Sequence, residues 1–88
     1  METNYKTVTI EEIKAGQYYM YKDAEPAINT IVQVTSITEE HVVVSGWDWS
    51  GPFTEGKIKK QVFIDNLLLV ENLDPQYYLK PELRTPAS

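Results

Sequence analysis

The chain has 88 residues, no cysteine, one histidine and a formal net charge of −5. This length suits one small domain, and no apolar run approaches the ~20 residues of a membrane-spanning helix. The lack of cysteine excludes disulfides, thiolate catalysis and cysteine-based zinc sites. The acidic balance argues against non-specific nucleic-acid binding, which needs clustered lysine and arginine.

The first element is predicted close to the N-terminus. Thr9 and Glu12 have the spacing of a capping box, in which each residue satisfies a free backbone N–H of the other. Gly16 provides a stop, because glycine readily adopts the left-handed conformation that follows many helices. We therefore expect a short helix over Ile10–Ala15.

From Gln17 onward the sequence predicts short β-strands, because segments rich in Val, Ile, Tyr and Thr are separated by turn residues. Thr38–His41 is expected to form a hairpin turn, and Asp65–Asn66 a tight turn. The expected strands are Tyr18–Tyr21, Ile28–Ile37, Val42–Ser45, Lys59–Ile64 and Leu67–Val70.

The second of these strands carries apolar residues on both faces. Val32 and Val34 share one face under two-residue alternation, whereas Ile31 and Ile37 fall on the other. This pattern predicts a bend or a β-bulge within the strand.

Beyond the last strand, Asp74 and Pro75 have the order of an N-cap and a first helical residue. We expect a helical turn reaching Tyr77–Leu79, followed by a flexible tail. The predicted organisation is one domain over residues 1–80 and a tail over residues 81–88.

The strand pattern resembles SH3-like barrels. The resemblance covers Ile13–Val70 and lies in Ile13–Tyr18, which leads into the first strand, a long central hairpin, and the closing Val62–Val70 segment. It implies a mainly β fold, a small barrel of about five strands that hides its strand edges. An OB-like barrel is the rival. Peptide-binding SH3 domains carry adjacent tryptophans at the start of a middle strand; Trp47 and Trp49 instead follow a strand and are not adjacent, so the proline-peptide site is not transferred.

The segment Gly46–Gly56 is predicted to be an aromatic loop, because both tryptophans and Phe53 fall between glycines. Three interpretations stay open. Trp47 and Trp49 could form a lid on the barrel end, an exposed patch for a protein partner, or part of a ligand cage or base-stacking platform.

We expect a non-catalytic protein-interaction module, either an adaptor or an inhibitor. The expected contact residues are Trp47, Trp49 and Phe53, and Asp48 and Glu55 would supply polar contacts at the rim. An alternative is a small acidic protein, encoded by a phage or another mobile element, that blocks a host nucleic-acid-binding protein. Its acidic groups would be Asp23, Glu25, Glu39, Glu40, Asp48 and Glu55.

A basic cluster permits a third alternative. Lys57, Lys59 and Lys60 lie close to the loop aromatics and could bind single-stranded nucleic acid. Lysines on a strand also protect an exposed sheet edge against aggregation, and we favour that interpretation because the chain is acidic.

Two motifs that would indicate chemistry are incomplete. Gly51–Lys57 has the glycine and lysine spacing of a phosphate-binding loop, but Ile58 stands where a Ser or Thr is required. His41 has no second histidine or cysteine with which to hold a metal ion. We therefore expect no enzyme activity, no metal and no cofactor.

The start of the chain bears on location. Met1–Lys6 lacks the basic and apolar regions of a signal peptide. We expect a cytoplasmic protein with a protein partner, without nucleic-acid or membrane binding.

Overall fold

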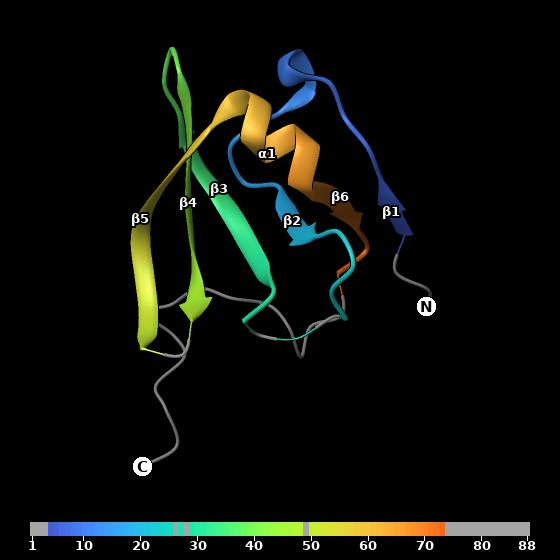
Figure 1. Cartoon of the computed structure of the whole chain (residues 1–88), viewed down its shortest axis with the longest axis vertical. Helices are drawn as coiled ribbons and strands as arrows, with labels where there is room; N and C mark the ends of the chain where they lie inside the picture. The colour runs from blue at the N-terminus through green and yellow to red at the C-terminus, as the bar shows by residue number, and fades with distance from the viewer. Residues whose placement is uncertain (1–3, 26, 28, 49, 74–88) are drawn as a thin grey trace.

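The computed structural model describes residues 4–25, 27, 29–48 and 50–73. Its six strands form one antiparallel sheet in the order β1-β6-β2-β3-β4-β5 (Figure 1). The strands are β1 (Asn4–Lys6), β2 (Tyr18–Tyr21), β3 (Ile31–Ile37), β4 (His41–Asp48), β5 (Gly51–Lys59) and β6 (Leu67–Glu71).

The mainly β prediction is confirmed. Among the described strands, β1 and β5 are the two edges and do not pair with each other, so backbone hydrogen bonds do not close this sheet into a barrel. β1 is absent from the sequence-based prediction. It is a short strand with only exposed residues, paired with β6, and therefore lacks the apolar alternation that identifies a strand.

The predicted helix at Ile10–Ala15 is shorter than expected. The structure has a 3₁₀ helix, η1 (Ile10–Glu12), and the backbone N–H of Thr9 donates to Oε1 of Glu12 at 2.8 Å. The capping box is thus confirmed. The helix ends early because Ile13 takes an extended conformation and is buried in the core.

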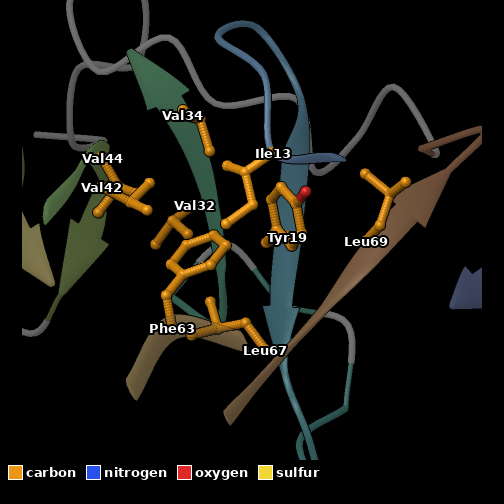
Figure 2. Packing of buried hydrophobic residues seen from close by; sticks show 9 residues of the cluster. All are labelled: Ile13, Tyr19, Val32, Val34, Val42, Val44, Phe63, Leu67 and Leu69. Carbon is orange, nitrogen blue, oxygen red and sulfur yellow. The ribbon is translucent and has the colours of Figure 1, made fainter. Parts of the chain in front are cut away.

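The sheet has an inner face, which bears the main core (Figure 2). This core draws on strands β2, β3, β4 and β6, on Ile13 and on one helix. On the helix, Phe63 is fully buried and its ring meets that of Tyr19 edge to face, with centroids 4.6 Å apart. The buried members are Ile13, Tyr19, Val32, Val34, Val42, Val44, Phe63, Leu67 and Leu69.

The strand predicted at Lys59–Ile64 is wrong, and so is the tight turn at Asp65–Asn66. Residues Lys60–Asn66 form a helix, α1, that connects β5 to β6 across the inner face (Figure 1). Val62 is half exposed while Phe63 is fully buried, so one apolar side chain of this run enters the core and its neighbour does not. The β-propensity of the run gives way to this packing, because local preference is weak beside burial.

The predictions for β3 and its turn are largely confirmed. The pairing register of β3 with β4 shifts between Val34 and Ser36, which is the expected β-bulge. The extra residue, Thr35, donates from Oγ1 to the carbonyl oxygen of Val43 at 3.1 Å. In the turn that follows, His41 N donates to Thr38 Oγ1 at 3.0 Å.

The loop predicted at Gly46–Gly56 is also wrong. This segment is the end of β4, a tight turn and most of β5. Two of its glycines make room for an aromatic ring: a Cβ on Gly46 would lie 3.2 Å from Phe53 Cζ, and one on Gly56 would lie 3.0 Å from Phe53 Cε2. Both glycines lie inside paired strands, where the lack of a side chain leaves space for the ring. From the sequence alone, such glycines cannot be distinguished from glycines of a loop.

Other predictions fall outside the described residues. These are the place of Ile28 in the second strand, the helical turn from Asp74 to Leu79, and the tail over residues 81–88. The closing strand predicted at Leu67–Val70 is confirmed as β6.

Candidate functional site

The β4–β5 hairpin carries the predicted contact residues. Trp47 and Asp48 end β4, and Phe53 and Glu55 lie in β5. Trp49 is outside the described residues.

Asp48 and Ser50 fix the hairpin turn. Oδ1 of Asp48 accepts hydrogen bonds from the backbone N–H of Ser50 at 2.8 Å and from its hydroxyl at 2.6 Å. These bonds favour the ionised carboxylate and hold the pKa of Asp48 below its usual value. Gly51 follows with a φ of 120°, which a residue with a side chain rarely adopts. Asp48, which the sequence predicts as a polar contact at the rim, therefore also stabilises the turn.

Trp47 and Phe53 point to opposite faces of the sheet. Phe53 pairs with Gly46 and packs against the inner core, whereas Trp47 is the next residue along and pairs with Pro52. Because side chains alternate along a strand, the predicted single aromatic patch is divided between two faces. Trp47 packs against a second buried cluster, formed by Met20, Ile31 and Val70.

Glu55 lies in a bulge of β5. Between the pairs Val44–Gly56 and Gly46–Phe53, β5 has two residues where β4 has only Ser45. Glu55 is exposed, and its carboxylate makes no hydrogen bond or ion pair with the described residues.

A groove of about 570 Å³ runs along β5 and brings three of the five predicted contact residues together. Its apolar lining comes from Val44, Phe53 and Ile58, and Tyr21 of β2 lies across from them. In Figure 1, α1 crosses only the upper part of the sheet, and the lower parts of β4 and β5 extend beyond it. The full lining is Tyr21, Val44, Asp48, Phe53, Thr54, Glu55, Gly56, Lys57 and Ile58.

Sequence reasoning missed Val44 and Ile58 as site residues, and it considered Tyr21 only as one of three tyrosines that could form a ligand cage with Asp48 or Glu55. Two-residue alternation in the predicted strand Tyr18–Tyr21 already places Tyr19 and Tyr21 on one face. The pairing of β4 with β5 could not be predicted from the sequence, because the segment Gly46–Gly56 has the composition of a loop.

The three lysines of the predicted basic cluster lie on two elements. Lys57 and Lys59 lie on the edge strand β5, and both are exposed. Lys60 begins α1, so it is not part of a strand at all. Their place on an edge fits the expected protection against sheet-to-sheet pairing. Lys57 alone lines the groove.

The acidic groups do not all lie together. Glu39 and Glu40 lie in the β3–β4 turn, and Asp48 lies at the other end of β4. The eight residues of β4 put these ends roughly 23 Å apart. Asp23 and Glu25 follow β2, whose end lies away from the β3–β4 turn (Figure 1).

His41 is partly buried at the start of β4, opposite Lys59, and does not line the groove. Within the described ranges, no group of three His, Cys, Asp or Glu residues could hold a metal ion.

A second, smaller groove of about 280 Å³ lies between β1, η1 and β6. Its charged groups have both signs, and its lining includes Lys6, Glu11, Glu12 and Lys14. It contains no residue that the sequence indicates as a contact.

In the part of the chain that the structure describes, no helix is long and apolar enough to cross a bilayer. Comparisons with models of protein families, with curated proteins and with solved structures found no match.

Proposed function

We propose that this protein is a non-catalytic interaction module that binds a protein partner through the groove beside β5. The observation that carries the proposal is the convergence of Asp48, Phe53 and Glu55 on one groove, although they come from two strands. The sequence pattern by itself indicates the same three residues as contacts. A partner segment would insert apolar or aromatic side chains into this groove.

The chemistry of the groove suits a protein segment. Apolar side chains line it, and Tyr21, which is 41% exposed, offers an aromatic surface beside them. Tyrosine is among the residues that contribute most at protein interfaces, because it combines a large apolar area with a hydroxyl. A volume of about 570 Å³ falls in the range of pockets that enclose small ligands or a few side chains.

The charges at the rim favour a partner with at least one basic group. Asp48 and Glu55 outnumber Lys57 there, and the chain as a whole carries a net charge of −5. Charged groups at an interface rim act mainly on association rate and specificity. The affinity is therefore expected to fall as salt concentration rises.

We also propose an SH3-like arrangement for the chain. The support is the strand order β6-β2-β3-β4-β5, with consecutive strands as neighbours and a short helix between β5 and the closing strand. This arrangement would place the groove between the central hairpin and the first strand of the motif.

The groove supports binding better than catalysis. Its ionisable groups are Tyr21, Asp48, Glu55 and Lys57, and one carboxylate is already engaged by Ser50. A general base needs a reaction partner within hydrogen-bond reach and a suitably shifted pKa. Asp48 has its pKa shifted downward, which makes it a weaker base.

The proposal is tested by affinity capture from the source cell with the full chain, the variant Tyr21→Ala/Glu55→Lys, and the control Tyr5→Ala/Glu39→Lys. Tyr5 is 37% exposed and Glu39 is exposed, and both lie outside the groove, so the control changes the same residue types. The groove variant should lose a protein that the control still captures. Equal capture by both variants would refute the groove as the binding site.

A further inference from the structure

The outer edge of β5 presents main-chain groups that β4 does not use. β5 is an edge strand, and no described strand lies beyond it (Figure 1). The backbone N–H of Lys60 donates to the carbonyl oxygen of Glu40 at 3.1 Å, which continues the register of β4 with β5 as a hydrogen-bonded pair. Bonded and non-bonded pairs alternate along antiparallel strands. Ile58 and Gly56 therefore bond to β4, and the N–H and carbonyl groups of Lys57 point away from it.

The groove beside β5 extends to this edge. Successive side chains of a strand point to opposite faces, so a groove over one face alone would meet every second side chain. This groove is lined by all six residues from Phe53 to Ile58. Glu55 and Lys57 are exposed and alternate with the half-buried Gly56 and Ile58 of the inner face. A segment that enters the groove thus lies beside the free main-chain groups of β5.

The charge along this edge changes sign. Lys57 and Lys59 are exposed on the half of β5 next to α1, whereas Glu55 is exposed two positions before Lys57. Asp48 lines the groove together with Glu55. Side chains directly opposite each other in an antiparallel pair attract when their charges differ and repel when they are alike. A strand that pairs with β5 therefore needs acidic residues opposite the lysines and a basic residue opposite Glu55.

We propose that the protein partner binds as a short extended segment that adds an antiparallel strand to β5. This inference rests on the proposed function, because it specifies how a partner occupies the same groove. Strand addition is a common way to recognise an extended peptide, and the antiparallel direction matches every described pair of this sheet. From its N-terminus the segment is acidic, apolar, acidic, aromatic and basic, opposite Lys59, Ile58, Lys57, Gly56 and Glu55 in turn.

The apolar and aromatic positions follow from the inner face of β5. Residues directly opposite each other share a face, so the side chains opposite Ile58 and Gly56 enter the groove. Gly56 leaves its own side open to the ring of Phe53, because a Cβ there would lie 3.0 Å from Phe53 Cε2. An aromatic side chain opposite Gly56 would lie against that ring, and aromatic residues stabilise edge glycines across a strand pair. Tyr21 lines the other side of the groove.

The hydrogen bonds are tested with the peptide acetyl-Thr-Glu-Val-Glu-Tyr-Lys-Thr-amide, titrated into the full chain with its backbone amides isotope-labelled for NMR. In the proposed register the second glutamate exchanges both hydrogen bonds with Lys57, whereas the N–H of the tyrosine points away from β5. N-methylation of the second glutamate should weaken binding by about tenfold or more, and N-methylation of the tyrosine by about twofold or less.

A charge exchange tests the register. Replacing the second glutamate of the peptide by lysine should weaken binding to the unaltered chain by about fivefold or more, because two like charges then lie opposite each other. Lys57→Glu should restore the binding of this altered peptide. The control Lys60→Glu reverses an equal charge on α1, outside the paired stretch, and should not restore it.

The outcomes separate this inference from the proposed function. Equal weakening by the two N-methylated peptides, with the amides of residues 53–58 still shifted, would overturn strand addition and leave the groove as a binding site. An unmodified peptide that shifts none of these amides at millimolar concentration would also overturn it, and the affinity capture would still decide the proposed function. Shifts of the same amides on dilution of the free protein would overturn it as well, because they would assign the edge to a second copy of the chain.

Discussion

The ring of Phe53 occupies the space in which a side chain on Gly56 would stand: a Cβ there would lie 3.0 Å from Phe53 Cε2. A Cβ on Gly46 would lie 3.2 Å from Cζ of the same ring. The two glycines flank the ring on paired strands and keep it against the inner core while its edge lines the groove.

Alanine at Gly46 is expected to destabilise the fold by about 1–3 kcal/mol, because the added methyl group overpacks the site. The new Cβ would also meet the carbonyl oxygen of Ile31 at 3.2 Å, and a backbone atom cannot move aside cheaply. Gly56→Ala should cost less, since its neighbours are side chains. Denaturant unfolding measures both. Thr54→Ala, at an exposed position, is the control, and equal midpoints for all three variants would contradict the packing described.

Substitutions at two adjacent residues of α1 are expected to differ sharply in their effect on stability. Phe63→Ala should cost about 3–5 kcal/mol because it removes a fully buried ring, a large part of the stability of a small domain. Val62→Ala, at a half-exposed position, should change stability by about 0.5 kcal/mol or less. Thermal melts of both variants test this. A larger loss at Val62 than at Phe63 would contradict the helix.

Alkaline unfolding should depend on Tyr19. Burial, with a smaller contribution from the charge of Glu12, raises the pKa of Tyr19 from 10.0 to about 12. Because the folded pKa is the higher one, its contribution to stability is complete below pH 10 and is lost as pH rises toward about 12. Tyr19→Phe should flatten this dependence, although it also removes the 2.9 Å bond from the hydroxyl to Gln17 Oε1. An unchanged alkaline slope in Tyr19→Phe would show that the hydroxyl titrates as in an unfolded chain.

Acid should weaken the β4–β5 hairpin through Asp48. Hydrogen bonds from Ser50 hold the pKa of Asp48 below its usual value, so its contribution is present above the unfolded-state pKa and is lost as pH falls through the lower, folded one. Asp48→Ala should lower the melting temperature at neutral pH and reduce its acid dependence, whereas Glu55→Ala should do neither. Melting curves at several pH values provide the comparison.

The elements that could be predicted from the sequence are those whose signal is local. The capping box of Thr9 and Glu12, the bulge in β3 and the closing strand β6 depend on neighbouring residues, and each is confirmed. The hairpin at Gly46–Gly56 could not be predicted, because Gly46 and Gly56 leave room for the ring of Phe53, and the contact with Gly46 forms only when β4 and β5 pair.

The same reason explains the helix and the divided aromatic patch. Val62–Ile64 has the composition of a strand, but it lies in α1, where Phe63 is buried in the core. The sequence predicts Trp47 and Phe53 on one loop surface, and the strand register separates them. Asp48, Phe53 and Glu55 converge on one groove, and Tyr21 joins them through pairing that a single sequence does not reveal.

The most direct test of the groove is hydrogen–deuterium exchange of the full chain, free and bound to the protein that it captures. We expect slower exchange on binding in the β5 segment from Phe53 to Ile58 and around Tyr21, with no change in β1 or η1. Protection confined to the smaller groove between β1, η1 and β6, with exchange along β5 unaltered, would contradict binding through the groove beside β5.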